Sequence, residues 1–536
     1  MAEASARARP NFLFIITDQH KAEHLGCYGN PQVRTPNLDG LAARGWCADR
    51  MFVATPICMP NRATLMTGRL PSVHGVRHNG IPLSLDAVTF VDVMRAAGYR
   101  TALIGKSHLQ NFTGTASIVP KPKYPGDLPP PPLAEAWRDG NDIAAYEQEW
   151  PPRWADPDFE MRLPFYGFER VRLCIEHGDE VGGHYERWLR ERHPEAEKLR
   201  GAANAEPTPG IACPQAWKTR VPEELYTTSF VAEETIRALR DYAAAGERPF
   251  FLQCSFPDPH HPFTPPGRYW SMFDPADMRL PPSFRPADNR TPPHVRWLHA
   301  QRDAGKAVKH TPAVFACTER EAREAMALSF GSIAMIDDAI GRVLAELARL
   351  GLAENTVVVF TTDHGDFLGE HQLMFKGPLH FDGIIRNPLI WADPQARGGG
   401  GRSAAFSQAQ DIPVTILERA GLAPFNGVQG RSLLPVIGGD GAAGRDCVLI
   451  EEEGQRTYLG FDRRVRVRTL IDGRWRLSVY DGASWGELYD RREDPHEMAN
   501  LWEDSGYAAA RAEMTEKMAR AMLAASDTSP HPIAIA

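Results

Sequence analysis

Four predicted strands that each run into a polar side chain constrain the fold of this chain most strongly. The pairs of strand and following residue are residues 11–17 with Asp18, residues 99–104 with Lys106, residues 249–256 with His260, and residues 356–361 with Asp363. The first run, Asn-Phe-Leu-Phe-Ile-Ile-Thr, lacks polar alternation, as is typical of a strand buried on both faces of a parallel sheet. Ligands bind at the carboxyl edge of open α/β sheets, so we expect these four side chains to share one site.

Helices are predicted between the strands. The predicted helices are residues 35–45, 89–97, 223–245 and 318–350. Thr318 and Glu321 have the spacing of a capping box at the start of the last of these helices. Strands that alternate with helices favour an α/β fold with a large, mostly parallel sheet flanked by helices.

The C-terminal part of the chain has a different pattern. Beyond about residue 436, short alternating strands at residues 464–471 and 475–480 predict an antiparallel hairpin. We therefore expect a catalytic α/β domain over residues 1–436 and a smaller antiparallel-sheet subdomain over residues 437–536.

Two segments of the large domain lack a clear period. Residues 110–220 are interpreted as a long variable insertion, which either selects the substrate or decorates the surface. Residues 280–312 are rich in proline and basic residues and are predicted to be a loop.

Composition narrows the class of protein. Hydrophobic residues make up 43% of the chain and charged residues 24%, so a substantial core is available. The net charge of −8 argues against a general nucleic-acid binder, although an acidic protein can hold a local cationic pocket. No apolar signal-peptide core follows the first ten residues, and residues 11–17 are too short to span a membrane. We expect a cytoplasmic protein whose eight scattered cysteines are reduced thiols.

The stretch from Thr55 to Arg69 is predicted to be a loop that runs into a helix. Pro60 suits the first helical turn and Gly68 a C-terminal cap. Cys58 would then lie at the helix N-terminus, where exposed N–H groups favour negative charge, with Arg62 on the same face. A nucleophile position above a fixed cation suits attack on an anionic ester.

This stretch also carries a family resemblance. The sequence Cys58-x-Pro60-x-Arg62, followed by Leu-Met-Thr-Gly-Arg, resembles the signature of the type I sulfatases of the alkaline phosphatase superfamily. Residues 486–490 are similar to the family's C-terminal motif, and the resemblance covers most of the chain except about 110–220 and 280–315. It implies an alkaline-phosphatase-like α/β domain and a small C-terminal domain with a four-stranded antiparallel sheet.

The resemblance also implies the nucleophile and the metal site. Cys58 would be converted to formylglycine by a formylglycine-generating enzyme, and one hydroxyl of the hydrated aldehyde would attack the ester, with Asp363 taking its proton. The implied ligands of one divalent metal ion are Asp18, Gln19, Cys58, Asp363 and His364. Carboxylates suit Ca²⁺ or Mg²⁺, and an imidazole shifts the preference toward Mn²⁺. Many sulfatases have a second aspartate where Gln19 stands, so the identity of the metal stays open.

Cationic and polar side chains are expected around the transferred group. By the resemblance they are Arg62, Lys106, His108, His260 and Lys376, with Asn79 as a further contact to the ester oxygens. His260 or His108 would protonate the leaving alcohol, and His261 is a lower-ranked rival. Lys376 could equally be a solvated surface lysine.

Three functions from two classes compete. A hydrolase of sulfate monoesters of a small alcohol or phenol is favoured, because Lys106 and His108 resemble a lysine and a histidine that sulfatases have at these positions. Asp18-Gln19 instead resembles the phosphonate monoester hydrolase branch, which leaves a phosphonate monoester or phosphodiester hydrolase as the alternative. A binding protein that has kept the fold would have lost the nucleophile or a ligand, and none is lost. No nucleic-acid or membrane partner is expected, and relatives of this type commonly form dimers or tetramers.

Overall fold

A nine-stranded mixed sheet organises the described part of the chain. The computed structural model describes residues 9–113, 143–246, 248–396 and 401–534. The strands in order across the sheet are β13 (Gly401–Ser403), β2 (Trp46–Ala48), β12 (Leu389–Ala392), β9 (Thr356–Thr362), β1 (Asn11–Thr17), β7 (Phe250–Ser255), β4 (Arg100–Lys106), β5 (Arg170–Ile175) and β6 (Gly182–Gly183). Smaller pairings join β10 (Leu373–Met374) to β8 (Phe315–Ala316), and β3 (Met51–Phe52) to β11 (Arg386–Asn387) and β14 (Ser407–Gln408).

The four strands predicted from the sequence are neighbours in the middle of this sheet. Strands β9, β1, β7 and β4 run parallel, and Ile15 of β1 lies beside Cys254 of β7 and Phe360 of β9. Strand β12 pairs antiparallel to β9, which makes the sheet mixed. The predicted α/β fold is confirmed, and the carboxyl ends of the four central strands meet at one edge.

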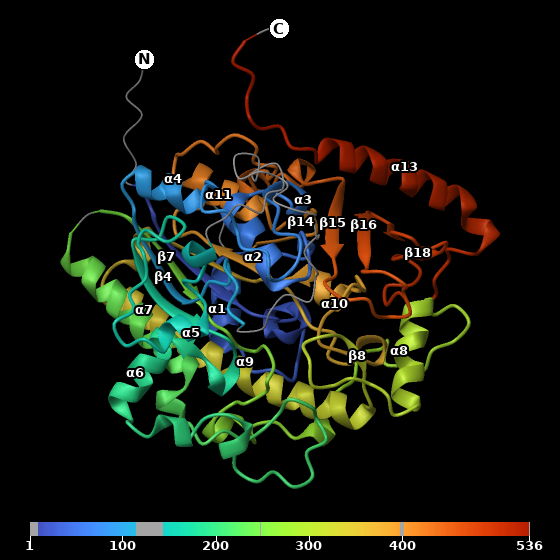
Figure 1. The fold of residues 1–536 in the computed structure, drawn as a ribbon. Coiled ribbons are helices and arrows are strands. Elements are labelled where there is room, and N and C mark those ends of the chain that lie inside the picture. The colour runs from blue at the N-terminus through green and yellow to red at the C-terminus, as the bar shows by residue number, and fades with distance from the viewer. Residues whose placement is uncertain (1–8, 114–142, 247, 397–400, 535–536) are drawn as a thin grey trace, which may run out of the picture.

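Alternate side chains of β1 enter two separate cores. Phe12, Phe14 and Ile16 pack into one hydrophobic cluster, whereas Leu13 and Ile15 pack into another on the opposite face of the sheet. Helices α2 (Cys58–Thr67), α4 (Phe90–Ala96) and α11 (Asp411–Arg419) contribute to the first cluster. Helices α1 (Pro36–Arg44), α6 (His184–Arg192), α7 (Thr227–Ala244) and α9 (Glu319–Arg349) contribute to the second. The sheet is thus the middle layer of three (Figure 1).

Helices α4 and α9 begin where the sequence predicts, whereas α7 begins at Thr227, four residues later than predicted. Thr89 and Asp92 form a capping box on α4, and Thr318 and Glu321 form one on α9. Each of these side chains satisfies a backbone N–H group that has no partner within its helix. The remaining short α-helices are α3 (Pro71–His74), α5 (Pro151–Trp154), α10 (Asp382–Ile385) and α12 (Leu434–Ile437).

Two expectations about irregular segments are corrected. Residues 110–220 are not irregular throughout, because β5 lies within them and pairs parallel with β4 in the main sheet. Arg170 and Arg172 alternate with apolar residues in the first half of β5, which hides its buried character in the sequence. Residues 280–312 contain α8 (Pro293–Asp303), whose start at a proline pair reads as loop, although proline is well tolerated in the first helical turn. The part of the insertion at residues 114–142 lies outside the described residues.

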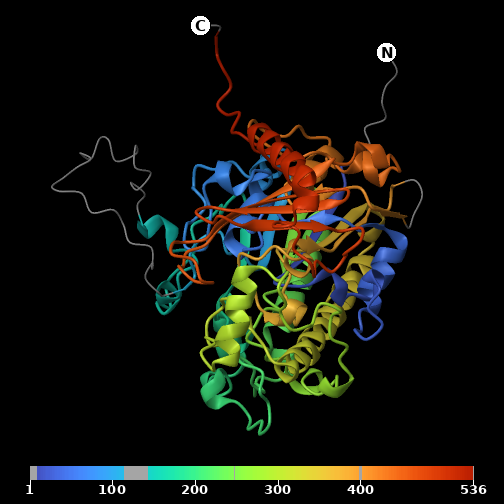
Figure 2. The same ribbon diagram turned by 90° about the vertical axis from the view of Figure 1, so that its right-hand side faces the viewer.

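A second, antiparallel sheet forms the C-terminal part of the chain. Its strands are β15 (Cys447–Glu453), β16 (Arg466–Asp472), β17 (Trp475–Tyr480) and β18 (Gly486–Asp490), in that order. Leu470 and Leu477 on one face pack against α13 (Ala508–Ala524), which covers this sheet in Figure 2. Ile450 and Val467 on the other face pack against residues of the large domain. The four-stranded sheet confirms the expected C-terminal architecture, and the boundary at residue 436 stays a prediction.

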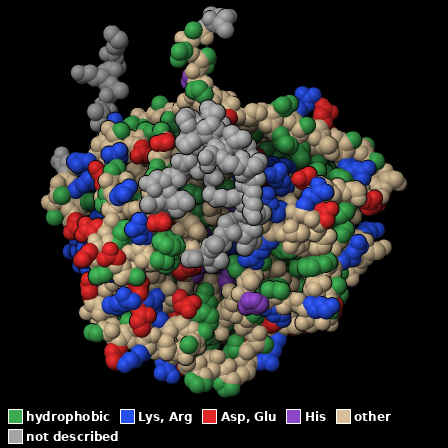
Figure 3. Space-filling model, in the orientation of Figure 1, with side chains coloured by type: hydrophobic (Ala, Val, Ile, Leu, Met, Phe, Trp, Pro, Cys, Tyr) green, Lys and Arg blue, Asp and Glu red, His purple; other side chains and the backbone are tan. Residues whose placement is uncertain are grey.

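The surface charges and the state of the cysteines can be compared with the expectations from composition. On the face shown in Figure 3, acidic and basic side chains of the described residues are interspersed. All eight cysteines lie among the described residues, and all are free thiols. Within the described ranges, every helix is too short or too polar to cross a bilayer. The cytoplasmic location stays a prediction.

Candidate active site

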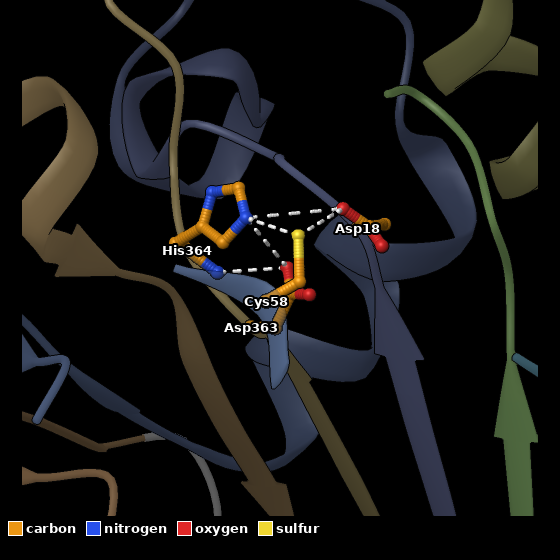
Figure 4. Close-up of side chains that lie close together, drawn as sticks. All are labelled: Asp18, Cys58, Asp363 and His364. Carbon is orange, nitrogen blue, oxygen red and sulfur yellow. Dashed lines mark hydrogen bonds and ion pairs between the residues drawn. The ribbon is translucent and has the colours of Figure 1, made fainter. Parts of the chain in front are cut away.

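Two strand ends and one helix start bring the predicted nucleophile and metal ligands together. Asp18 follows β1, Asp363 and His364 follow β9, and Cys58 is the first residue of α2. All four side chains are buried, and their potential ligand atoms lie within 4.8 Å of one another. Figure 4 shows the four side chains converging on one point.

Contacts at both ends of α2 fix this helix, and with it Cys58 at its first position. Gly68 ends the helix with a left-handed backbone, φ 64°, as predicted for its C-terminal cap. At the start, the side-chain oxygen of Asn79 accepts a hydrogen bond from the N–H of Met59, at 3.1 Å. Asn61 links the helix to two other segments, because it accepts from the N–H of Ala54 and donates to the carbonyl of Asp363. Asn79 therefore caps the catalytic helix, and its predicted contact with substrate stays a prediction.

The donor set fits a divalent metal ion. Nε2 of His364 lies 3.9 Å from Oδ1 of Asp18, 3.8 Å from Oδ1 of Asp363 and 3.1 Å from Sγ of Cys58. Nδ1 of His364 lies 2.8 Å from the carbonyl of Gly365 and donates to it in the neutral tautomer, which leaves the lone pair of Nε2 directed at the cluster. Two carboxylates and one imidazole around a common centre suit hard or borderline divalent cations.

Gln19 lies beside this cluster and is already engaged. Its Oε1 accepts from Nζ of Lys376 at 2.9 Å, and its amide nitrogen donates to Oδ2 of Asp366. Its backbone N–H donates to Oδ1 of Asp363 at 3.1 Å, and its φ is 56°. To serve as a ligand, the Gln19 carbonyl would have to share or give up the Lys376 hydrogen bond, so its assignment as a ligand stays a prediction.

Arg62 joins the two carboxylates of the cluster. Its Nε donates to Oδ2 of Asp363 at 2.8 Å and its Nη2 to Oδ2 of Asp18 at 3.3 Å. A further nitrogen donates to Oγ of Ser255 and to the carbonyl of Lys106, both at 3.2 Å. A planar guanidinium with several donors can hold all these oxygens at once, which an ammonium cannot. The cation predicted beneath the nucleophile is therefore in place.

Lys376 lies within the site and not on the surface. It is 6% exposed, and its Nζ lies 2.9 Å from Sγ of Cys58, 2.9 Å from Nε2 of His260 and 3.2 Å from Nε2 of His364. Burial and the nearby Asp18 raise the pKa of Cys58, but Lys376, His364 and Lys106 outweigh them, so this pKa lies below its ordinary value. The structure thus provides a cationic environment for an anion at position 58.

Lys106 and His177 lie at the other side of Asp18. The ammonium group of Lys106 donates to Oδ2 of Asp18 and lies 2.6 Å from Nε2 of His177. Burial raises the pKa of Asp18, but Lys106, His260 and Arg62 outweigh it, and the pKa lies well below its ordinary value. Asp18 is therefore ionised, as a metal ligand must be.

The two candidate acids for the leaving alcohol take different positions. His108 stacks on Phe112 with ring centroids 3.6 Å apart, and its Nδ1 has no hydrogen-bond partner among the described residues. His260 stacks on His177 at 3.6 Å, and its Nε2 is 2.9 Å from Nζ of Lys376. Both side chains line the cavity above Cys58. Their roles stay predictions.

His261 lines the same cavity as the two candidate acids. Its ring stacks on Phe375 with centroids 3.8 Å apart, and its Nδ1 lies 3.2 Å from the amide nitrogen of Gln19. The lower rank given to His261 stays a prediction.

Sequence reasoning missed several residues that shape the site. His177 follows β5, the strand hidden in the segment read as an insertion. Asp366 lies three residues beyond Asp363 and receives the Gln19 amide. Glu149 accepts the backbone N–H groups of residues 108, 109 and 110, at 2.8, 3.0 and 3.2 Å. Of the three, only Asp366 has a local sequence signal, its position in the Asp-His-Gly-Asp run after β9. His177 and Glu149 act through contacts with residues that are remote in sequence, so no local pattern marks them.

A cavity of about 420 Å³ opens above these residues. Cys58, Lys376 and the two candidate acids form its floor, and its walls include Phe112 and Glu176. Arg456 reaches it from the loop between β15 and β16 of the C-terminal sheet. A small molecule with an anionic group at the floor and a larger leaving group toward the walls fits this shape.

Comparisons with known proteins agree with this geometry. The sequence profile of the Sulfatase family matches residues 10–422, and that of the N-sulphoglucosamine sulphohydrolase C-terminal region matches residues 369–523. An arylsulfatase of Clostridium perfringens is 26% identical over 93% of this chain and 91% of its own length. A multifunctional alkaline phosphatase superfamily protein, PehA of Trinickia caryophylli, is 27% identical over 94% and 93%.

A solved structure extends the similarity to the whole fold. The phosphonate monoester hydrolase of Agrobacterium radiobacter has a TM-score of 0.75 and 27% identity, with 97% of each chain covered. The family profile spans more than half of the chain and includes all four residues of the cluster. The chain therefore belongs to the sulfatase family, whose members are hydrolases that act on sulfuric esters.

Proposed function

We propose that this protein hydrolyses sulfate monoesters of a small alcohol or phenol, with residue 58, converted to formylglycine, as the nucleophile. The observation that carries the proposal is the position of Cys58, whose side chain lies 3.1 Å from His364 and 2.9 Å from Lys376 at the floor of the cavity. A buried structural cysteine would not need such charged neighbours. Formylglycine at this position would present a hydroxyl of its hydrate to the ester.

The charges around the site suit a singly charged ester. The carboxylates of Asp18 and Asp363 are matched by the cations of Arg62, Lys106 and Lys376, which leaves an excess of positive charge. Fixed cations in a site closed to water stabilise negative charge that develops during the reaction. A divalent cation held by Asp18, Asp363 and His364 would add Lewis-acid polarisation of oxygen atoms at the same point.

The protein's own residues supply the remaining steps. Arg62 holds both carboxylates of the cluster in a fixed geometry. Lys106 binds Asp18, Lys376 lies beside residue 58, and His108 or His260 delivers a proton to the oxygen of the departing alcohol. The sulfur–oxygen bond to that alcohol would break as a hydroxyl of the residue 58 hydrate bonds to sulfur, and the alcohol would leave as a neutral molecule. Loss of the proton of the second hydroxyl would then expel sulfate and restore the aldehyde.

A phosphonate monoester or phosphodiester hydrolase is the second candidate. It is favoured by the Asp18-Gln19 pair and by the similarity to the phosphonate monoester hydrolase fold. Such esters also carry one negative charge, so the charge count does not separate the two. Lys106 and His108 favour the sulfate ester.

A comparison of three substrates tests the proposal. The protein, co-expressed with a formylglycine-generating enzyme, is assayed for kcat/KM on an aryl sulfate, an aryl phosphodiester and an aryl phosphonate monoester. We expect the aryl sulfate to be preferred by at least tenfold, and the activity to vanish in Cys58→Ala. A preference for either phosphorus ester would support the second candidate.

A further inference from the structure

Arg456 of the C-terminal sheet reaches the wall of the cavity above Cys58. It lies in the loop of residues 454–465, which joins β15 to β16. The loop is anchored, because Leu459 is 2% exposed within the hydrophobic cluster between the two sheets, and Gly454 donates to the carbonyl of Val465 at 2.7 Å. The loop between β15 and β16 thus contributes a charged side chain to the cavity above Cys58.

Arg456 has no acidic partner among the described residues. Its one hydrogen bond there runs from Nη1 to Oγ1 of Thr311, at 3.3 Å. The acidic side chains at the end of β15 are already engaged, since Glu452 lies 3.0 Å from His380 and Glu453 pairs with Arg77 at 3.4 Å. Arg456 is half-buried and lines the cavity, and its remaining donors have no protein partner among the described residues.

A second set of contacts positions Arg456. The amide nitrogen of Gln215 donates to the carbonyls of Lys309 and Thr311, at 3.0 and 3.1 Å. This holds the segment whose Thr311 hydroxyl receives Arg456. A guanidinium whose orientation is set in this way loses little conformational entropy when it binds an oxyanion.

The two charged residues of the cavity walls lie toward different ends. Arg456 also lines a neighbouring cavity with Ile57 and Gly377, whereas Glu176 also lines one with Gly182 on the side of β5. Arg456 and Lys376 line both the cavity above Cys58 and the neighbouring one with Ile57, whereas Cys58, His108 and His260 line only the first. Among the described residues, Arg456 therefore lies on the side of the cavity away from the two candidate acids. An anion bound by Arg456 would therefore belong to the leaving alcohol and would be kept apart from the carboxyl group of Glu176.

We propose that the substrate is a sulfate ester whose alcohol carries a second oxyanion, a carboxylate or another sulfate, and that Arg456 binds this group. The inference rests on the proposed function and narrows its substrate class. Arg456 is a specificity residue and takes no part in bond breaking. Two oxygens of a carboxylate or a sulfate can accept parallel hydrogen bonds from the planar guanidinium of arginine, which gives geometric selection as well as attraction.

Substrates matched in shape test this proposal. The probes are 4-carboxyphenyl sulfate, its neutral methyl ester, and benzene-1,4-diyl disulfate, which separates the two oxyanions. The wild-type protein should show at least tenfold higher kcat/KM for one or both anionic probes than for the methyl ester. Arg456→Gln should lower that preference to near unity, mainly through KM, because the lost contact is made in ground state and transition state alike.

A matched control and a binding readout keep the test decisive. Arg463→Gln removes the same charge from the same loop at an exposed residue paired with Asp462, and should leave the preference unchanged. Binding of 4-carboxyphenyl sulfate and of its methyl ester to Cys58→Ala protein is measured by calorimetry, which does not depend on turnover. Failure of the proposed function would abolish turnover and leave the Arg456-dependent binding difference. Equal affinity for the two probes, or an equal loss of affinity for both in Arg456→Gln, would overturn the inference.

Discussion

The ammonium group of Lys376 lies 2.9 Å from Sγ of Cys58, at the floor of the cavity. Lys376 comes from the segment after β10, whereas Cys58 begins α2, so the contact joins residues more than three hundred positions apart. Burial disfavours the charged form of this lysine, but Cys58 and Asp18 outweigh it and keep the pKa of Lys376 above its ordinary value. The lysine is therefore cationic at neutral pH and directed at the reacting residue.

Replacement of Lys376 tests its role. Lys376→Met keeps the length of the side chain and removes the charge. We expect kcat/KM for an aryl sulfate to fall by about 10²–10³-fold, because a fixed cation next to developing negative charge is lost. The control Lys517→Met removes a lysine on α13 that pairs with Asp472, and should change the rate less than twofold. A rate in Lys376→Met within threefold of wild type would exclude a catalytic role.

Arg62 should be needed for the metal cluster as well as for the rate. Arg62→Lys cannot reach Asp18 and Asp363 together, so one buried carboxylate loses its partner. We expect a loss of about 3–5 kcal/mol in the free energy of unfolding, as is usual when one partner of a buried ion pair is removed. Urea unfolding with saturating metal measures it. A loss below about 1 kcal/mol would show that lysine replaces both contacts.

Metal removal should lower stability and activity together. Asp18, Asp363 and His364 are buried, and an ion that binds only the folded protein stabilises it by about 2.7 kcal/mol at a concentration one hundred times its Kd. Chelation should therefore lower the unfolding midpoint of the wild type and abolish sulfate release, and divalent metal should restore both. In Asp363→Asn the midpoint should respond much less to chelation. An equal response in the two proteins would place the metal elsewhere.

Glu149 makes stability depend on pH. Burial raises the pKa of Glu149 from its ordinary 4.5 to about 7, although the backbone N–H groups that it accepts lower it in part. Between pH 4.5 and about 7, Glu149 therefore keeps its proton in the folded state, whereas the unfolded chain has released it. The contribution of Glu149 to stability is fully present below pH 4.5 and is lost as pH rises through about 7, at up to about 1.4 kcal/mol per pH unit.

The variant Glu149→Gln isolates this contribution. Glutamine keeps an acceptor for the N–H groups of residues 108–110 and does not titrate. We expect its urea midpoint to fall less than that of the wild type between pH 5 and 8. Parallel curves for the two proteins would mean that Glu149 is ionised throughout.

The central sheet was predictable because its strands carry their own signal. Strands β1 and β9 have continuous apolar centres, residues 12–16 and 357–360, and each strand is followed directly by a metal-ligand candidate that the sheet edge positions. Cys58 was located by the proline, arginine and glycine that follow it, since these residues fix where the helix begins and ends. For such elements local sequence and tertiary structure agree.

The missed elements depend on contacts that no local pattern encodes. Strand β5 has two arginines, Arg170 and Arg172, in its first half, so its place beside β4 follows only from the packing of the sheet. His177 lies in the site because it follows β5, which pairs with β4 and so ends beside Lys106. Arg456 lines the same cavity as Cys58 but comes from the loop between β15 and β16, and Glu149 accepts the backbone N–H of His108, so neither residue belongs to a local motif. The walls of the cavity are thus less predictable than its floor.

The most direct test of the central claim measures sulfate release against conversion of residue 58. Samples with graded conversion are prepared by varying co-expression of the formylglycine-generating enzyme, and mass spectrometry of the peptide of residues 51–62 gives the converted fraction. The account predicts that the initial rate of sulfate release from an aryl sulfate is proportional to this fraction, with no activity at zero conversion or in Cys58→Ala. A rate that is independent of conversion, or that persists in Cys58→Ala, would contradict the assignment of residue 58 as the nucleophile.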